Sequence, residues 1–175
     1  PTLRYVGAAQ QLTADPRDSA NTAMAAVAWT SDAPSVATVS ASGLVTAVGN
    51  GTASISATAG GVTSAPGVLV SVQQVGATFV LSPSSIAFGA ISSQRQVTAT
   101  LQDSGGAPMT LPLVGWSIAS GTQTSVTSTG LVTALGVTAG APNTIRATVS
   151  SGGGTFFDDV PLLFEAGIDK RVDKI

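Results

Sequence analysis

The stretch Gly43-Leu44-Val45-Thr46-Ala47 occurs twice in this chain, the second time as Gly130-Leu131-Val132-Thr133-Ala134. Each copy begins fourteen residues after a tryptophan, Trp29 in the first case and Trp116 in the second. These are the only 2 tryptophans of the chain, and one spacing of 87 residues relates both landmarks. An internal repeat of this length predicts one structural unit of about 80 to 90 residues that is used twice.

The composition of the 175 residues favours folded domains with a surface that carries few charges. Hydrophobic residues make up 43% of the chain, whereas charged residues make up only 9%, against about 25% in an ordinary soluble domain. A net charge of -2 offers no basic patch for nucleic acid, and no apolar run is long enough for membrane insertion. The chain has 0 cysteines, which excludes disulfides and remains compatible with an extracellular location.

Short β-branched segments between turn residues predict two tandem antiparallel β-sandwiches, an all-β fold. Residues 52–59 show the pattern best, because Ala53, Ile55 and Ala57 alternate with hydroxyl side chains after the Asn50-Gly51 turn. In the first copy we expect strands at residues 11–15, 27–30, 35–40, 44–48, 52–59 and 68–72. In the second copy we expect them at residues 97–99, 114–118, 145–149 and 155–165. The expected domains are residues 1–75 and 76–165, followed by a charged tail at 166–175.

Each sandwich is expected to close around one tryptophan. The expected core residues are Trp29, Val45 and Ile55 in the first domain and Trp116, Val132 and Ile145 in the second. A sugar-stacking role for the indoles is the alternative, but apolar neighbours on a central strand favour the core.

The first domain has an incomplete first strand. Residues 79–86 of the second domain are typical of a first strand that switches sheets at Pro83, whereas the chain from Pro1 holds only the second part of such a strand. Two interpretations stay open at this point. The chain was cut at its ends, or a neighbouring chain supplies the missing strand by β-augmentation.

A family resemblance rests on Val27-Ala28-Trp29-Thr30-Ser31-Asp32-Ala33-Pro34-Ser35-Val36-Ala37-Thr38-Val39, Ser42-Gly43-Leu44-Val45-Thr46-Ala47 and Gly51-Thr52-Ala53-Ser54-Ile55. Together these segments resemble the bacterial immunoglobulin-like domain of group 2. The second copy is looser, since Ser120-Gly121-Thr122 replaces the Asp-x-Pro-Ser turn. The resemblance implies immunoglobulin-like topology in both sandwiches and a place on a bacterial or phage surface, as a stalk, a layer component or a virion decoration.

The sequence offers little support for catalysis, and we expect neither an enzyme nor a cofactor. There are 0 histidines, and the adjacent pair Asp158-Asp159 would point to opposite faces of a strand. Calcium is the other candidate chemistry, because four aspartates lie in or beside expected turns: Asp15, Asp18, Asp32 and Asp103. Single aspartates in turns more often bond to their own backbone, so no metal site is predicted.

The function expected from these observations is that of a structural subunit in an extracellular assembly, a surface layer, filament or virion. Its partners would be copies of itself or other subunits, contacted through sheet edges and terminal segments. The expected contact residues are Phe156, Phe157, Lys170, Arg171 and Lys174. The alternative is an adhesin module that binds a glycan or host protein through the loops at residues 107–113 and 137–143.

Overall fold

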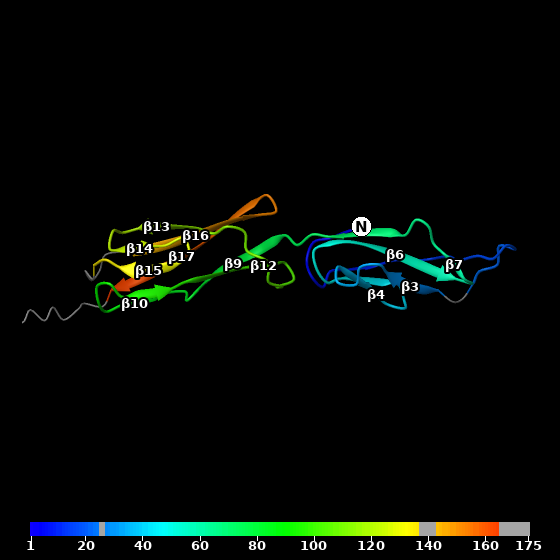
Figure 1. The fold of residues 1–175 in the computed structure, drawn as a ribbon, viewed down its shortest axis with the longest axis horizontal. Coiled ribbons are helices and arrows are strands. Elements are labelled where there is room, and N and C mark those ends of the chain that lie inside the picture. Colours follow the sequence, from blue (N-terminus) through cyan, green and yellow to red (C-terminus); the bar gives the residue numbers. More distant parts are fainter. Residues whose placement is uncertain (25–26, 137–142, 165–175) are drawn as a thin grey trace, which may run out of the picture. The chain divides into compact units, whose positions relative to one another are not determined.

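The computed structural model describes residues 1–24, 27–136 and 143–164, and all regular elements among them are strands (Figure 1). This confirms the all-β fold class. The chain divides into two compact units. Unit 1 contains residues 1–77 together with 102–109, and unit 2 contains residues 78–101 together with the chain from 110 onward. The expected domains 1–75 and 76–165 assign residues 102–109 to the second domain, whereas the structure groups these residues with unit 1. Whether the two domains fold independently stays a prediction.

Unit 1 is built from two sheets. Its strands are β1 (Thr2–Leu3), β2 (Ala9–Gln11), β3 (Ala28–Ser31), β4 (Ala37–Val39), β5 (Leu44–Ala47), β6 (Gly51–Ala59), β7 (Val62–Thr63) and β8 (Val68–Val72). One sheet has the order β1-β8-β6-β3, with β7 paired to β6, and the other has the order β2-β5-β4. Alternate residues of both sheets point inward, as sandwich strands require. The buried core consists of Leu3, Ala8, Ala37, Val45, Ala47, Ala53, Ile55, Val70 and Val72.

Unit 2 repeats the order of the two main sheets, adds the strand pair β9–β12 and has no counterpart of β7 among its described strands. The remaining strands are β9 (Gly76–Ser82), β10 (Ile86–Phe88), β11 (Gln94–Gln96), β12 (Thr98–Asp103), β13 (Gly115–Ser120), β14 (Thr124–Val126), β15 (Leu131–Ala134), β16 (Asn143–Ser151) and β17 (Gly154–Phe164). The sheets have the orders β10-β17-β16-β13 and β11-β15-β14, and the added strand β9 pairs with β12. The chain changes sheets between β9 and β10, next to Pro83, as the sequence predicts.

The registers of the two units correspond residue by residue. Trp29 lies opposite Ala57 on the β3–β6 ladder, and Trp116 lies opposite Ala147 on the β13–β16 ladder. Val45 and Val132 hold the matching positions on β5 and β15, opposite Val39 and Val126. One feature of both units was not predicted: β1 pairs with β8 and β10 pairs with β17 in parallel, so neither sandwich is purely antiparallel.

The prediction of a strand at residues 11–15 is wrong. The strand β2 ends at Gln11, and residues 12–16 have no ladder partner. The matching residues in unit 2 form β12, because β9 lies beside them. The N–H of Leu12 donates to Gly43 and the carbonyl of Pro16 accepts from Met24, but among the described residues no hydrogen bond engages the backbone of residues 13–15, which a strand would require.

Candidate functional site

The two tryptophans lie at the margin of each core, where sequence reasoning placed them at the centre. Both indoles are half-buried, and Trp29 packs against the buried cluster of unit 1. The centres are filled instead by smaller residues, since Val45, Val132, Ile55 and Ile145 are almost completely buried. The glycine that begins each repeated Gly-Leu-Val-Thr-Ala block lies against the indole, and its lack of a side chain leaves room for the ring. A Cβ on Gly43 would lie 2.9 Å from Cζ2 of Trp29, and a Cβ on Gly130 would lie 2.7 Å from Cζ2 of Trp116.

A shallow hollow lies beside each tryptophan. The hollow of unit 1 has a volume of about 320 Å³ and includes Gln11, Trp29 and Ser42 in its lining. That of unit 2 has a volume of about 340 Å³ and is lined by the matching residues Gln96, Trp116 and Thr129. The two hollows are therefore the same site repeated, with a tryptophan next to polar side chains in each.

Asp18 and Asp103 form the same turn in the two copies. In each turn one carboxylate oxygen accepts two backbone N–H groups, from Ala20 and Thr22 in the first case and from Gly105 and Ala107 in the second. This is the backbone-bonding turn expected for single aspartates.

The second carboxylate oxygen of Asp103 has further partners within unit 1. Its Oδ2 accepts the backbone N–H of Val6 and the amide of Gln74, both at 2.9 Å. Burial, to 2% exposure, raises the pKa of Asp103, but these hydrogen bonds and those of Gly105 and Ala107 outweigh it and lower the pKa below its ordinary value. Sequence reasoning missed this contact, because no local pattern connects residues 97 positions apart.

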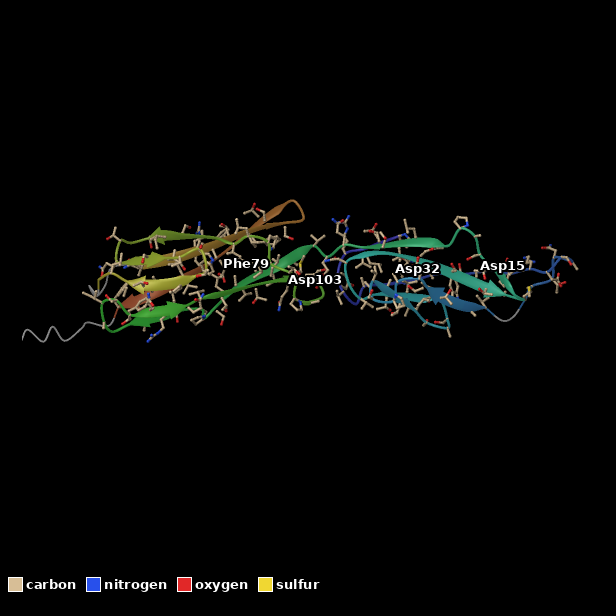
Figure 2. The ribbon with its side chains drawn as sticks, in the orientation of Figure 1. Asp15, Asp32, Phe79 and Asp103 are labelled. Carbon is tan, nitrogen blue, oxygen red and sulfur yellow. The ribbon has the colours of Figure 1, made fainter. Side chains whose placement is uncertain are left out.

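The four turn aspartates do not come together. Asp15 binds Arg17 at 3.0 Å, and Asp32 accepts the N–H of Ser54 at 2.7 Å, at separate places in unit 1 (Figure 2). Within the described residues, no group of three or more potential ligands could hold a metal ion. These carboxylates act as turn and strand acceptors, which is the role that turn chemistry predicts.

An exposed cluster lies on the outer face of β16 and β17. We call Arg146, Phe157 and Asp159 the Arg146 cluster. The guanidinium lies 4.4 Å from the centre of the Phe157 ring and donates two hydrogen bonds of 2.7 Å to Asp159. Hydrogen bonding from Arg146 outweighs burial and lowers the pKa of Asp159, and the same bond raises the pKa of Arg146.

The adjacent phenylalanines point to different faces, as a strand requires. Phe157 is 59% exposed on the same face as Leu163, which is 60% exposed, whereas Phe156 is half-buried on the other face. The three other expected contact residues, Lys170, Arg171 and Lys174, lie outside the described residues. Most of the 137–143 loop does so as well.

Unit 1 also contains a groove with a volume of about 530 Å³, which we call the edge groove. It lies between residues 14–19 and the β6–β7 hairpin. Its apolar lining consists of Ala14, Pro16, Met24, Val27, Ala57, Ala59 and Val62. None of the hydrogen bonds formed by the described residues engages the backbone of Thr13, Ala14 or Asp15, so the groove is bounded by an open strand edge.

Among the described residues, no helix has the length and hydropathy needed to span a membrane. The geometry is that of two strand sandwiches with repeated turns, an exposed cluster and one open edge. The first unit is similar to immunoglobulin-like domains of bacterial type. Residues 3–68 match the model of the bacterial Ig-like domain (group 2), which confirms the resemblance for this part of the chain.

Several solved structures are similar to the chain. The crystal structure of domains 4 and 5 of the S-layer protein SbsC is 23% identical over 92% of each chain, with a TM-score of 0.41. A longer SbsC structure, of domains 4–9, is 27% identical with a TM-score of 0.41; it covers 90% of this chain, which spans 25% of that structure. Titin A168–A169 is 15% identical, covering 93% of this chain and 92% of the other, with a TM-score of 0.46. No curated protein matches the chain in sequence.

Proposed function

We propose that this chain is a non-catalytic structural module of an extracellular assembly, such as a surface layer, a filament or a phage virion. The observation that carries the proposal is a pair of sandwiches whose sheet edges have few charges to protect them, because only 9% of the residues are charged. Soluble sandwiches commonly protect sheet edges with charges or bulges, since open edges pair with other chains.

The family supports the location that we propose. Residues 3–68 match the model of the bacterial Ig-like domain, and a chain with 0 cysteines is compatible with an assembly outside the cytoplasm. The second unit repeats the strand order and register of the first. We propose that it belongs to the same family and acts as a second module of the same kind.

Two further surfaces are proposed as subunit contacts. One is the Arg146 cluster together with Leu163, because Phe157 and Leu163 present exposed apolar area beside a charged pair. The other is the tail at residues 166–175, which contains Lys170, Arg171 and Lys174.

Sedimentation velocity over a range of concentrations tests this proposal. We expect the chain with residues 166–175 intact to associate as the concentration rises. Phe157→Ala or removal of residues 166–175 should weaken the association without lowering the melting temperature. Phe156→Ala is the matched control for Phe157, since Phe156 lies on the other face of β17. A strictly monomeric chain at millimolar concentration would contradict self-assembly.

The alternative function, an adhesin module for a glycan or host protein, is favoured by one observation. The Trp29 and Trp116 hollows repeat an indole face beside amide and hydroxyl groups, and such surfaces suit sugar rings. Binding to a glycan array that disappears in the Gln11→Ala and Gln96→Ala double variant would support this alternative. Binding that is indifferent to both changes would exclude these hollows.

A further inference from the structure

We propose that Asn50 is a site of deamidation, and that its conversion to a carboxylate breaks a chain of hydrogen bonds that joins Asn50, Gln74 and Asp103 in unit 1. The inference goes beyond the proposed function and does not depend on it. All residues of the site are among those that the structure describes.

The sequence around Asn50 favours this reaction. The chain contains three asparagines, and Asn50 is the one that precedes a glycine, because Asn21 and Asn143 are each followed by a threonine. In deamidation the backbone nitrogen of the next residue attacks the side-chain carbonyl carbon of the asparagine. Glycine leaves that nitrogen accessible and its backbone free to adjust, whereas a β-branched threonine hinders the approach. Asn50 is also exposed, whereas Asn143 is buried.

The reaction needs water and no other reactant. After loss of its proton to hydroxide, the backbone nitrogen of Gly51 forms a bond with Cγ of Asn50, the Cγ–Nδ2 bond breaks, and ammonia leaves with a proton from water. Water then opens the resulting succinimide ring. Attack at Cγ gives aspartate, and attack at the main-chain carbonyl carbon gives isoaspartate. Both products carry a carboxylate in place of the amide, and no atom is oxidised or reduced.

The contacts of the Asn50 side chain favour the attack. Its Oδ1 accepts the backbone N–H of Gln74 at 2.6 Å, and its Nδ2 donates to Oε1 of Gln74 at 3.1 Å. Negative charge develops on Oδ1 when the nitrogen attacks, and a fixed N–H donor stabilises that charge. The fold also requires glycine at position 51, because its φ is 141° and a Cβ would lie 2.9 Å from Cγ2 of Val36.

The chain of hydrogen bonds runs in one direction. Asn50 donates to Oε1 of Gln74, and Nε2 of Gln74 donates to Oδ2 of Asp103 at 2.9 Å. Since an ionised carboxylate only accepts hydrogen bonds, Asp103 fixes the orientation of the Gln74 amide. A carboxylate at position 50 would place an acceptor against Oε1 of Gln74. If the amide turned over, its Oε1 would face Asp103 instead, so one of the two contacts is lost in either orientation.

The loss should be measurable at Asp103. Burial raises the pKa of this carboxyl, and the hydrogen bond from Gln74 is the strongest of those that lower it. A second carboxylate, linked through the same amide, adds repulsion between like charges. Deamidation of Asn50 should therefore raise the pKa of Asp103 and destabilise unit 1.

Incubation of the intact chain at alkaline pH in heavy-oxygen water tests the site. Peptide mapping by mass spectrometry then follows the incorporation of heavy oxygen at each asparagine. We expect conversion at Asn50 to be on the order of tenfold faster than at Asn21, which is also exposed but precedes threonine. Heavy oxygen that appears at Asn21 as fast as at Asn50, or at neither residue, would overturn the site.

The variant Asn50→Asp reproduces one product and tests the consequence. We expect a lower melting temperature and, by carboxyl NMR titration, a raised pKa of Asp103. Asn21→Asp is the matched control, since it also changes an exposed asparagine, and it should leave the pKa of Asp103 unchanged. In a Gln74→Ala background, which lacks the amide, Asn50→Asp should cost less stability. An unchanged pKa of Asp103, or an equal loss of stability with and without the Gln74 side chain, would overturn the link.

Discussion

The indole of Trp116 rests against Gly130, so closely that a Cβ at this glycine would lie 2.7 Å from Cζ2 of the ring. The same relationship holds between Trp29 and Gly43, at 2.9 Å. Both glycines have positive φ, 81° for Gly130 and 83° for Gly43, so two requirements meet at one position. Only glycine adopts this backbone easily and also leaves room for the ring.

Gly43→Ala and Gly130→Ala should therefore destabilise their units strongly. We expect a loss of about 1–2 kcal/mol from the left-handed backbone and about 1–3 kcal/mol more from overpacking, because the Cβ would meet both the indole and a backbone carbonyl oxygen, that of Leu12 at 2.6 Å from Gly43 or of Val97 at 2.5 Å from Gly130. Gly7→Ala is the matched control, since Gly7 has φ of 88° but no atom within 4 Å of a Cβ. Urea unfolding measures all three variants. Equal losses for Gly7→Ala and Gly43→Ala would show that the indole contact contributes nothing.

Asp103→Asn should destabilise unit 1, because both carboxylate oxygens accept N–H groups and an amide can replace only one of them. The loss expected from hydrogen bonds to a buried charged group is about 1.5–3 kcal/mol. Asp18→Asn is the matched control. It changes the same turn where the side chain is exposed, and we expect a change within about 0.5 kcal/mol. Chemical unfolding followed by Trp29 fluorescence in a Trp116→Phe background reports on unit 1.

The contribution of Asp103 to the free energy of unfolding should decrease as the pH falls. Its pKa is lower in the folded protein than the ordinary value of 3.8, so the stabilisation is complete above that value. It is lost as the pH falls below 3.8 and passes through the folded pKa. The difference in unfolding free energy between the wild type and Asp103→Asn should be constant from neutral pH to the ordinary carboxyl range and shrink below it. A difference that grew in acid would contradict the assignment.

Replacing Arg146 should raise the pKa of Asp159 toward its ordinary value of 3.8, because the hydrogen bond from the guanidinium is the main cause of its lowering. Carboxyl NMR titration of Arg146→Gln measures this change directly. Phe157→Ala keeps the two hydrogen bonds to Asp159 and should leave that pKa low. A low pKa of Asp159 in the Arg146→Gln variant would show that another group holds the charge.

The sequence predicts the strands whose partners lie within the repeat. Residues 52–59 alternate apolar and hydroxyl side chains, and the structure places β6 at Gly51–Ala59. The Gly-Leu-Val-Thr-Ala block predicts the strands β5 and β15, which follow its glycine directly. The glycine itself recurs because it must leave room for the indole. These are local requirements, so a single sequence is enough to show them.

Other features depend on long-range pairing and could not be read from the sequence. Residues 13–15 have the composition of a strand but no backbone hydrogen bond among the described residues. The contact of Asp103 with Val6 joins distant parts of the chain. The indoles lie at the margin and not at the expected centre, because other side chains, such as Val45, Ile55 and Phe88, fill the centres. In unit 2 the Phe88 and Phe164 rings also stack, 5.9 Å apart, which no periodicity indicated.

Native-state hydrogen exchange of backbone amides tests the open edge most directly. In the monomeric chain we expect the amides of Thr13, Ala14 and Asp15 to exchange rapidly, while amides of the matching residues 98–100 that bond to β9 are protected. Equal protection of the two segments in the free monomer would contradict the central claim that unit 1 presents an unpaired strand edge.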